Sequence, residues 1–81
     1  MRVSVHFFAA ARELAGREQM ELEIPVGCRV ADLRQQLALE VPRLAALLER
    51  CRLALNDDFA TDDQPVPAAA RLAVLPPVGG G

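Results

Sequence analysis

The last six residues, Pro-Pro-Val-Gly-Gly-Gly at positions 76–81, are the part of the chain best suited to a chemical role. Each proline fixes its own φ and biases the residue before it toward extended backbone, so the pair predicts a stiff stem. The glycines have no Cβ and can enter a slot too narrow for any other residue. The pattern indicates a tail that presents the carboxylate of Gly81 to another molecule, and an inert glycine tail is the alternative.

Residues 1–75 offer little other chemistry. The one histidine, His6, has no second histidine and no cysteine near it in sequence, which favours a surface or partner-contact role over metal binding. Cys28 and Cys51 match neither a C-x-x-C pair nor a zinc spacing, and we expect reduced, buried or half-buried thiols. The aspartates of residues 57–63 lack the spacing and glycine of a calcium loop, so we expect solvated turns and predict no metal site.

The composition is that of one small folded domain. The chain has 81 residues, 52% of them hydrophobic, which is enough for a single core. A net charge of −2 argues against nucleic acid as the main partner. All nine basic side chains are arginine, so the chain offers no side-chain amine as an acceptor for conjugation to itself. We find no leader-like segment and no apolar run of membrane length, and we expect a cytoplasmic protein.

The hydrophobic pattern predicts strands and one main helix. Residues 3–7 and 20–24 alternate between apolar and polar, as strands with one buried face do. Residues 9–15 between them predict a short helix that ends at Gly16. The main helix is predicted by an apolar stripe at helical spacing and is stopped by Pro42, after which a second helical segment continues toward Cys51; the stripe is Val30, Leu33, Leu37 and Val41.

The second half of the chain predicts two further strands. Residues 52–55 form one, followed by a tight turn at residues 56–58, and residues 59–60 are too short to assign. Residues 61–70 are a loop. Residues 71–75 are apolar on both faces, which is typical of an inner strand or of one covered by a partner. These elements predict an α+β domain over residues 1–75, a mixed sheet with one principal helix packed across one face, with residues 76–81 as its extended tail.

Several stretches together resemble the ubiquitin-like (β-grasp) sulfur-carrier family, and within it the small subunits of molybdopterin synthase. The matching stretches cover essentially the whole chain in order: VHFFA at 5–9, RELAG at 12–16, VADLR at 30–34, LN at 55–56 and LAVLPPVGGG at 72–81. The chain departs from the family at Val74 and Leu75, where aromatic residues are frequent, and at residues 67–71, which replace a polar turn. Gly79 also makes the tip thinner than usual.

The resemblance implies a β-grasp fold and a sulfur cycle carried by Gly81. An adenylating (E1-like) enzyme uses ATP to turn the carboxylate into an acyl-adenylate, and a sulfur donor then converts it to a thiocarboxylate. The thiocarboxylate donates its sulfur to cyclic pyranopterin monophosphate in molybdenum cofactor biosynthesis, within the active site of a large subunit. The chain is then the sulfur-donating subunit of a sulfurtransferase, not catalytic alone and with no permanently bound cofactor, in a heterotetramer of two small and two large subunits.

For partner contacts we predict the outer face of the sheet and the tail, namely Phe8, Arg12, Leu75, Pro76, Pro77, Val78, Gly79 and Gly80. Phe8 is equally consistent with a core position. Two alternatives stay open for the function. One is a sulfur carrier for thiamine or another metabolite, which the match at residues 12–16 and the proline pair disfavour. The other is a ubiquitin-like modifier whose Gly81 forms isopeptide bonds with lysines of other proteins.

Overall fold

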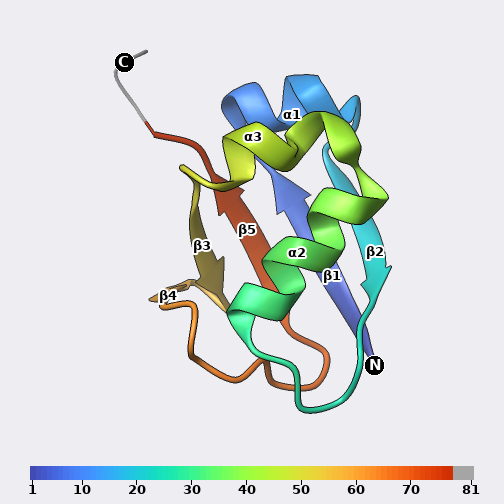
Figure 1. Cartoon of the computed structure of the whole chain (residues 1–81), viewed down its shortest axis with the longest axis vertical. Helices are drawn as coiled ribbons and strands as arrows, with labels where there is room; N and C mark the ends of the chain where they lie inside the picture. Colours follow the sequence, from blue (N-terminus) through green and yellow to red (C-terminus); the bar gives the residue numbers. More distant parts are fainter. Residues whose placement is uncertain (78–81) are drawn as a thin grey trace.

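The structure, a computed structural model, describes residues 1–77, and residues 78–81 lie outside the described part. Within residues 1–77, five strands form one mixed sheet in the order β2-β1-β5-β3-β4 (Figure 1). β5 pairs in parallel with β1, and the other neighbouring strands are antiparallel. The strands are β1 (Arg2–Phe7), β2 (Gln19–Glu23), β3 (Arg52–Leu55), β4 (Asp58–Ala60) and β5 (Arg71–Leu75).

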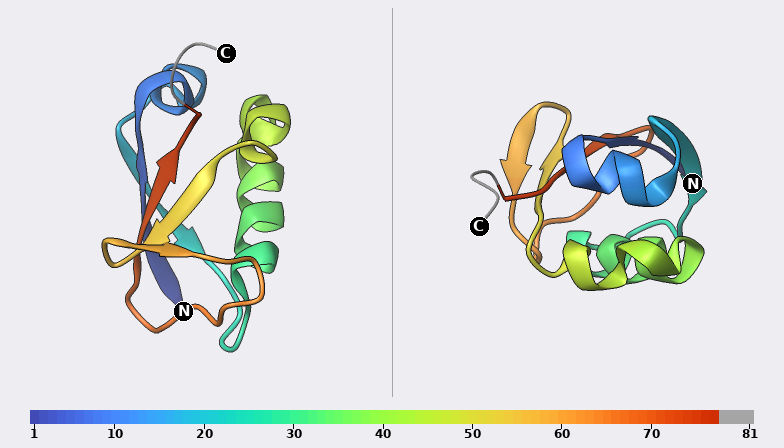
Figure 2. Two further views of the ribbon diagram at one scale, coloured as in Figure 1. Left: turned by 90° about the vertical axis from the view of Figure 1, so that its left-hand side faces the viewer. Right: turned by 90° about the horizontal axis from the view of Figure 1, so that it is seen from above.

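The helices form a second layer on one side of this sheet. The longest, α2 (Val30–Glu40), crosses one face, and the 3-10 helix η1 (Pro42–Leu44) and α3 (Ala45–Leu48) follow it on the same side (Figure 2). The short helix α1 (Ala9–Ala15) joins β1 to β2 at the end of the sheet where β5 also ends. No helix in residues 1–77 combines the length and apolarity needed to cross a membrane.

The core lies between α2 and the sheet because both present apolar residues at the period of their own backbone. Along β1, Val3, Val5 and Phe7 are buried, while the residues between them point to the other face. Three residues of the predicted stripe face them from α2, with Val30, Leu33 and Leu37 all fully buried, whereas the fourth, Val41, follows the helix and is half-buried. The α+β prediction of one principal helix across one face of a mixed sheet is therefore confirmed.

The helix α1 and the strands β3 and β5 lie where the sequence predicts them. α1 covers residues 9–15 and ends at Gly16, whose φ of 73° is the left-handed conformation that glycine adopts without strain. β3 and β5 have the predicted bounds, and β5 is an inner strand between β1 and β3. β2 begins and ends one residue before the predicted strand at residues 20–24.

The turn after β3 is shorter than predicted. The loop is Asn56 and Asp57, both with positive φ as a two-residue type I′ hairpin requires. Asp58 pairs with Leu55 and begins β4, and Phe59 pairs with Ala54. A strand of three residues is too short to show an alternating pattern, so only its pairing with β3 defines it.

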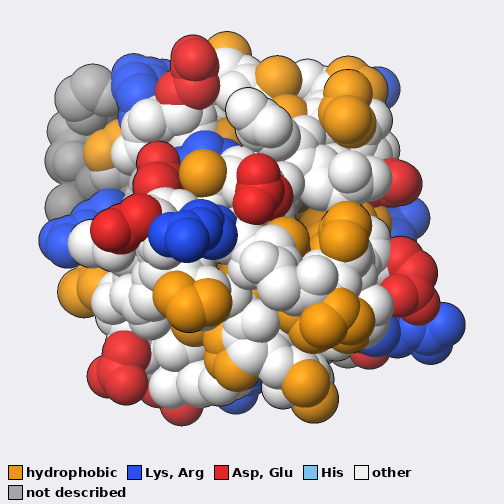
Figure 3. All heavy atoms as spheres, turned by 60° about the horizontal axis from the view of Figure 1, so that its bottom comes forward, with side chains coloured by type: hydrophobic (Ala, Val, Ile, Leu, Met, Phe, Trp, Pro, Cys, Tyr) orange, Lys and Arg blue, Asp and Glu red, His pale blue; other side chains and the backbone are white. Residues whose placement is uncertain are grey.

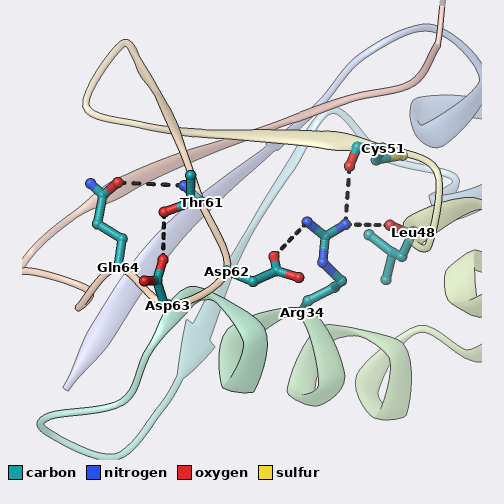
Figure 4. A network of polar contacts seen from close by, with 7 residues as sticks. All are labelled: Arg34, Leu48, Cys51, Thr61, Asp62, Asp63 and Gln64. Carbon is teal, nitrogen blue, oxygen red and sulfur yellow. Dashed lines mark hydrogen bonds and ion pairs between the residues drawn. The ribbon is translucent and has the colours of Figure 1, made fainter.

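The aspartates of the loop after β4 have structural partners (Figure 4). The guanidinium of Arg34 on α2 contacts Asp62 at 3.0 Å and also donates to the backbone carbonyls of Leu48 and Cys51. The hydroxyl of Thr61 donates to Asp63 at 2.7 Å, and this bond is the main cause that lowers the pKa of the Asp63 carboxyl. Arg34 thus ties α2 both to this loop and to the segment that leads into β3.

Candidate functional site

The face of the sheet opposite α2 carries no helix along its strands (Figure 2). Strand alternation directs every second residue to this outer face: Gln19, Glu21 and Glu23 on β2, Arg2, Ser4 and His6 on β1, Arg71, Ala73 and Leu75 on β5, Arg52 and Ala54 on β3, and Phe59 on β4. Near the end of β5 these residues are mostly apolar. Figure 3 shows a different side of the molecule, with the lower end of the Figure 1 view turned forward, and there hydrophobic side chains are scattered among acidic and basic ones.

A groove of about 650 Å³ lies on this outer face at the foot of the tail, and we call it the stem groove. It is lined by Phe8, Ala9, Arg50, Arg52, Phe59, Leu75, Pro76 and Pro77. A neighbouring hollow of about 240 Å³ shares Phe8, Phe59 and Leu75 with it. These three apolar side chains therefore form one patch that a partner can cover.

Phe8 reaches the groove because of its place at the end of β1. Phe7 is buried in the core. Because the backbone at Phe8 is extended (φ −128°, ψ 151°), the Phe8 side chain points to the face of the sheet opposite to that of Phe7. The Phe8 carbonyl accepts from the amide of Ala11 at 3.1 Å, which fixes the residue at the start of α1. With 44% of its surface exposed, Phe8 is a surface residue, and the core position that the sequence also allowed is wrong.

Phe59 is a functional candidate that the sequence analysis missed. It is 60% exposed, and the Arg52 guanidinium lies 4.1 Å from the centre of its ring. It was missed because residues 59–60 show no periodicity. A signal was nevertheless present in the composition, since the chain has only three aromatic residues, all phenylalanine, and two of them are exposed in this groove.

The stem leaves the sheet beside this patch. β5 stays paired up to Leu75, which lies opposite Arg52 of β3. Leu75 and Pro76 are half-buried and Pro77 is exposed. The predicted contact residues Phe8, Leu75, Pro76 and Pro77 are thus brought together, whereas Val78, Gly79, Gly80 and Gly81 lie outside the described residues.

Arg12 lies in a separate polar hollow of about 330 Å³, which is lined by His6, Phe7, Phe8, Ala9, Arg12, Glu18, Gln19 and Arg71. Its guanidinium contacts the Glu18 carboxylate at 3.8 Å, an exposed pair of small energetic value. His6 lines the same hollow, and its Nε2 lies 2.9 Å from the hydroxyl oxygen of Ser4. Because Phe8 lines both hollows, Arg12 adjoins the stem groove without lining it.

The two thiols lie on the other side of the sheet, in the core. Cys28 and Cys51 are buried, and burial is the main cause that raises the pKa of each thiol. A raised pKa keeps them protonated at neutral pH, and the thiol is a much weaker nucleophile than the thiolate. In the described part of the chain, no three His, Cys, Asp or Glu side chains are grouped closely enough to hold a metal ion.

Comparison with known proteins gives a full-length match. Residues 5–81 match the ThiS family. The molybdopterin synthase sulfur carrier subunit of Arabidopsis thaliana is 35% identical over 81 residues, which cover 100% of this chain and 84% of that protein.

Solved structures show the same fold. The chain is similar to SAMP1 from Haloferax volcanii, with a TM-score of 0.88, 22% identity and 100% of both chains covered. It is also similar to a chain in the complex of subunits 1 and 2 of the molybdopterin-converting factor from Helicobacter pylori, with a TM-score of 0.71, 28% identity and 100% of both chains covered. These likenesses confirm the predicted β-grasp fold.

Proposed function

The chain belongs to the ThiS family, and on that basis we propose that it is the sulfur-carrier subunit of a molybdopterin synthase, acting in the cytoplasm. The structural observation that carries the proposal is the place of the stem. Leu75, Pro76 and Pro77 leave an inner strand beside an exposed apolar groove, so a protein that covers the groove also receives the residues that follow.

The proposed chemistry takes place at the carboxylate of Gly81. A carboxylate is a poor electrophile, so an adenylating enzyme first joins one of its oxygens to the α-phosphate of ATP and releases pyrophosphate. A sulfur donor then supplies sulfur at the oxidation level of hydrosulfide, which attacks the carbonyl carbon, and AMP leaves with that oxygen. The resulting thiocarboxylate is the nucleophile in the active site of the large subunit, where its sulfur bonds to a carbon of cyclic pyranopterin monophosphate and an oxygen substituent leaves that carbon. Water then hydrolyses the thioester, which leaves the sulfur on the pterin and returns the tail to the carboxylate.

The stem groove explains why the tail needs a folded domain behind it. Residues 78–81 span at most about 14 Å when extended, so the partner's active site must lie close to Pro77. The groove supplies the contact that holds it there through Phe8, Phe59 and Leu75. Since the adenylating enzyme and the large subunit both need this tail, they use the groove in turn, and the large subunit holds it in an assembly of two small and two large subunits.

The test is intact-mass analysis of the chain after incubation with ATP, a sulfur donor and the adenylating enzyme of its own organism. A mass gain equal to the exchange of one oxygen for one sulfur is expected for the intact chain and none for a variant that lacks Gly81. Both proteins should give the same thermal melt, because the last strand of the sheet ends at Leu75, six residues before the one deleted.

Other outcomes identify the alternatives. Covalent attachment of the chain to lysines of other proteins, without sulfur uptake, points to a ubiquitin-like modifier. Sulfur uptake that restores thiamine synthesis in an extract but not molybdopterin synthesis points to a carrier of another pathway. No mass change with an enzyme that loads a known carrier contradicts the proposal.

A further inference from the structure

Two arginines flank the stem groove and have no role in the sulfur chemistry. Arg50 follows α3 and Arg52 begins β3, and both side chains are exposed at the groove. The remaining lining residues are apolar. Because the chain as a whole carries a net charge of −2, these two cations give the groove a local charge opposite to that of the molecule.

Arg52 is held in place by the aromatic ring of the patch. Its guanidinium carbon lies 4.1 Å from the centre of the Phe59 ring, a cation–π distance. A guanidinium that stacks on a ring keeps its N–H groups in the plane, where they can donate to a carboxylate. The contact favours this position of the cation before any partner arrives, which reduces the entropy lost when an ion pair forms.

Within the described part of the chain, neither arginine makes an ion pair. The ion pairs in that part join the amino group of Met1 and Arg2 to Glu23, Arg12 to Glu18, and Arg34 to Asp62. A partner that covers the apolar floor of the groove removes water from both guanidinium groups. An arginine that is desolvated without a counter-charge opposes binding, whereas one that meets a carboxylate there contributes to it.

We propose that the protein that docks on the stem groove carries carboxylate side chains beside its apolar contact residues, and that these pair with Arg50 and Arg52. The proposal rests on the proposed function, in which the large subunit covers this groove. It makes the two arginines specificity-determining residues: they attract an acidic docking surface and oppose a basic one before the tail enters any active site.

The test is the rate of association with the large subunit, measured by stopped-flow at several salt concentrations. The probe is the double charge reversal R50E/R52E, and the matched control is R17E/R43E. The control changes the net charge equally, and its two exposed arginines line a different hollow, between α1 and η1. A neutral variant, R50Q/R52Q, provides a milder change, and thermal melts check that all variants fold.

At low salt we expect R50E/R52E to associate at least about tenfold more slowly than the wild type, with R50Q/R52Q between them. The control should stay within about threefold of the wild type, since charges away from the interface act weakly through solvent. Raising the salt should bring the rates of all the proteins closer together, because screening removes steering.

The outcomes separate this inference from the proposed function. If the wild type takes up sulfur but R50E/R52E binds the large subunit at the wild-type rate, the inference is wrong and the proposed function stands. If the wild type neither takes up sulfur nor binds the large subunit, the proposed function fails and the inference with it. Self-association of the wild type that R50E/R52E abolishes would assign the groove to a second copy and overturn the inference.

Discussion

Both faces of the sheet carry apolar residues, and the two faces differ in what lies over those residues. On the inner face, Val3, Val5, Leu72 and Val74 are fully buried under α2. On the outer face, Phe8 and Phe59 remain about half exposed at the foot of the tail. The same strand alternation that builds the core therefore also builds an uncovered apolar patch.

This difference separates stability from association. An inner side chain is removed from water by folding itself, so its transfer free energy contributes to the stability of the monomer. An outer side chain gains most of its burial only when a partner covers it. Substitutions on the inner face should consequently change the stability of the monomer, and substitutions on the outer face should change its association with a partner.

The largest effect on stability is expected for Leu33→Ala on the inner face. Leu33 is fully buried in the stripe of α2, and its truncation leaves a cavity. The free energy of unfolding, measured by urea denaturation, should fall by about 2–5 kcal/mol. The fraction that stays folded should bind the large subunit with unchanged affinity. A loss of affinity in the folded fraction would show that the two faces are coupled.

The opposite result is expected for Phe59→Ala on the outer face. Affinity for the large subunit should fall by about 1–2 kcal/mol, measured by titration calorimetry, because an aromatic contact at the centre of an interface is lost. The free energy of unfolding should change by less than about 1 kcal/mol, since the ring is largely exposed.

The matched control for Phe59→Ala is Leu39→Ala. Leu39 is 74% exposed on α2, on the other side of the sheet. It should change neither affinity nor stability by more than about 0.5 kcal/mol. Equal losses of affinity for the two variants would mean that general surface hydrophobicity, and not the stem groove, drives association.

Arg34→Gln tests the connection between the two faces. The Arg34 guanidinium holds the carbonyls of Leu48 and Cys51, which flank Arg50 of the groove. Loss of these bonds and of the Asp62 contact should lower the free energy of unfolding by about 1–2 kcal/mol. We also expect slower association at low salt, and Asp62→Asn, which keeps the carbonyl contacts, should leave that rate unchanged.

The inner face could be predicted from the sequence in detail, because its pattern is local and repeated. The stripe of α2 and the alternation of β1 each show three or more buried residues at a fixed period, and the structure places them as predicted. Gly16 and Pro42 marked helix boundaries for conformational reasons that act within one or two residues.

The outer face could be predicted only in part, because it depends on pairing between distant segments. Phe8 and Leu75 were named from the order of the elements and the family resemblance. Phe59 and the two arginines of the groove were not, since their place follows from the pairing of β3 with β4 and β5. No pattern within a strand of three residues reports which side chain lies beside the stem.

The smallest expected effect is a pH dependence of stability, which tests how completely the inner face excludes water from the two buried thiols. Burial raises the pKa of the Cys28 and Cys51 thiols, so the folded chain retains their protons to higher pH than the unfolded chain does. This contribution to stability is fully present below the unfolded pKa of about 8.5 and is lost as pH rises through the folded pKa values. The chain has no lysine and no tyrosine, so few other side chains titrate in that range.

Urea denaturation between pH 7 and pH 10 should therefore show stability falling as pH rises, and the slope should decrease in the variant C28A/C51A. Modification of the two thiols by a maleimide at neutral pH should be much slower than in the urea-unfolded chain, because both are buried and protonated. Rapid modification of either thiol in the folded chain would show that the helix layer opens readily over the sheet. The inner face would then also be exposed to solvent for part of the time, and the two faces would differ only in how often they are exposed.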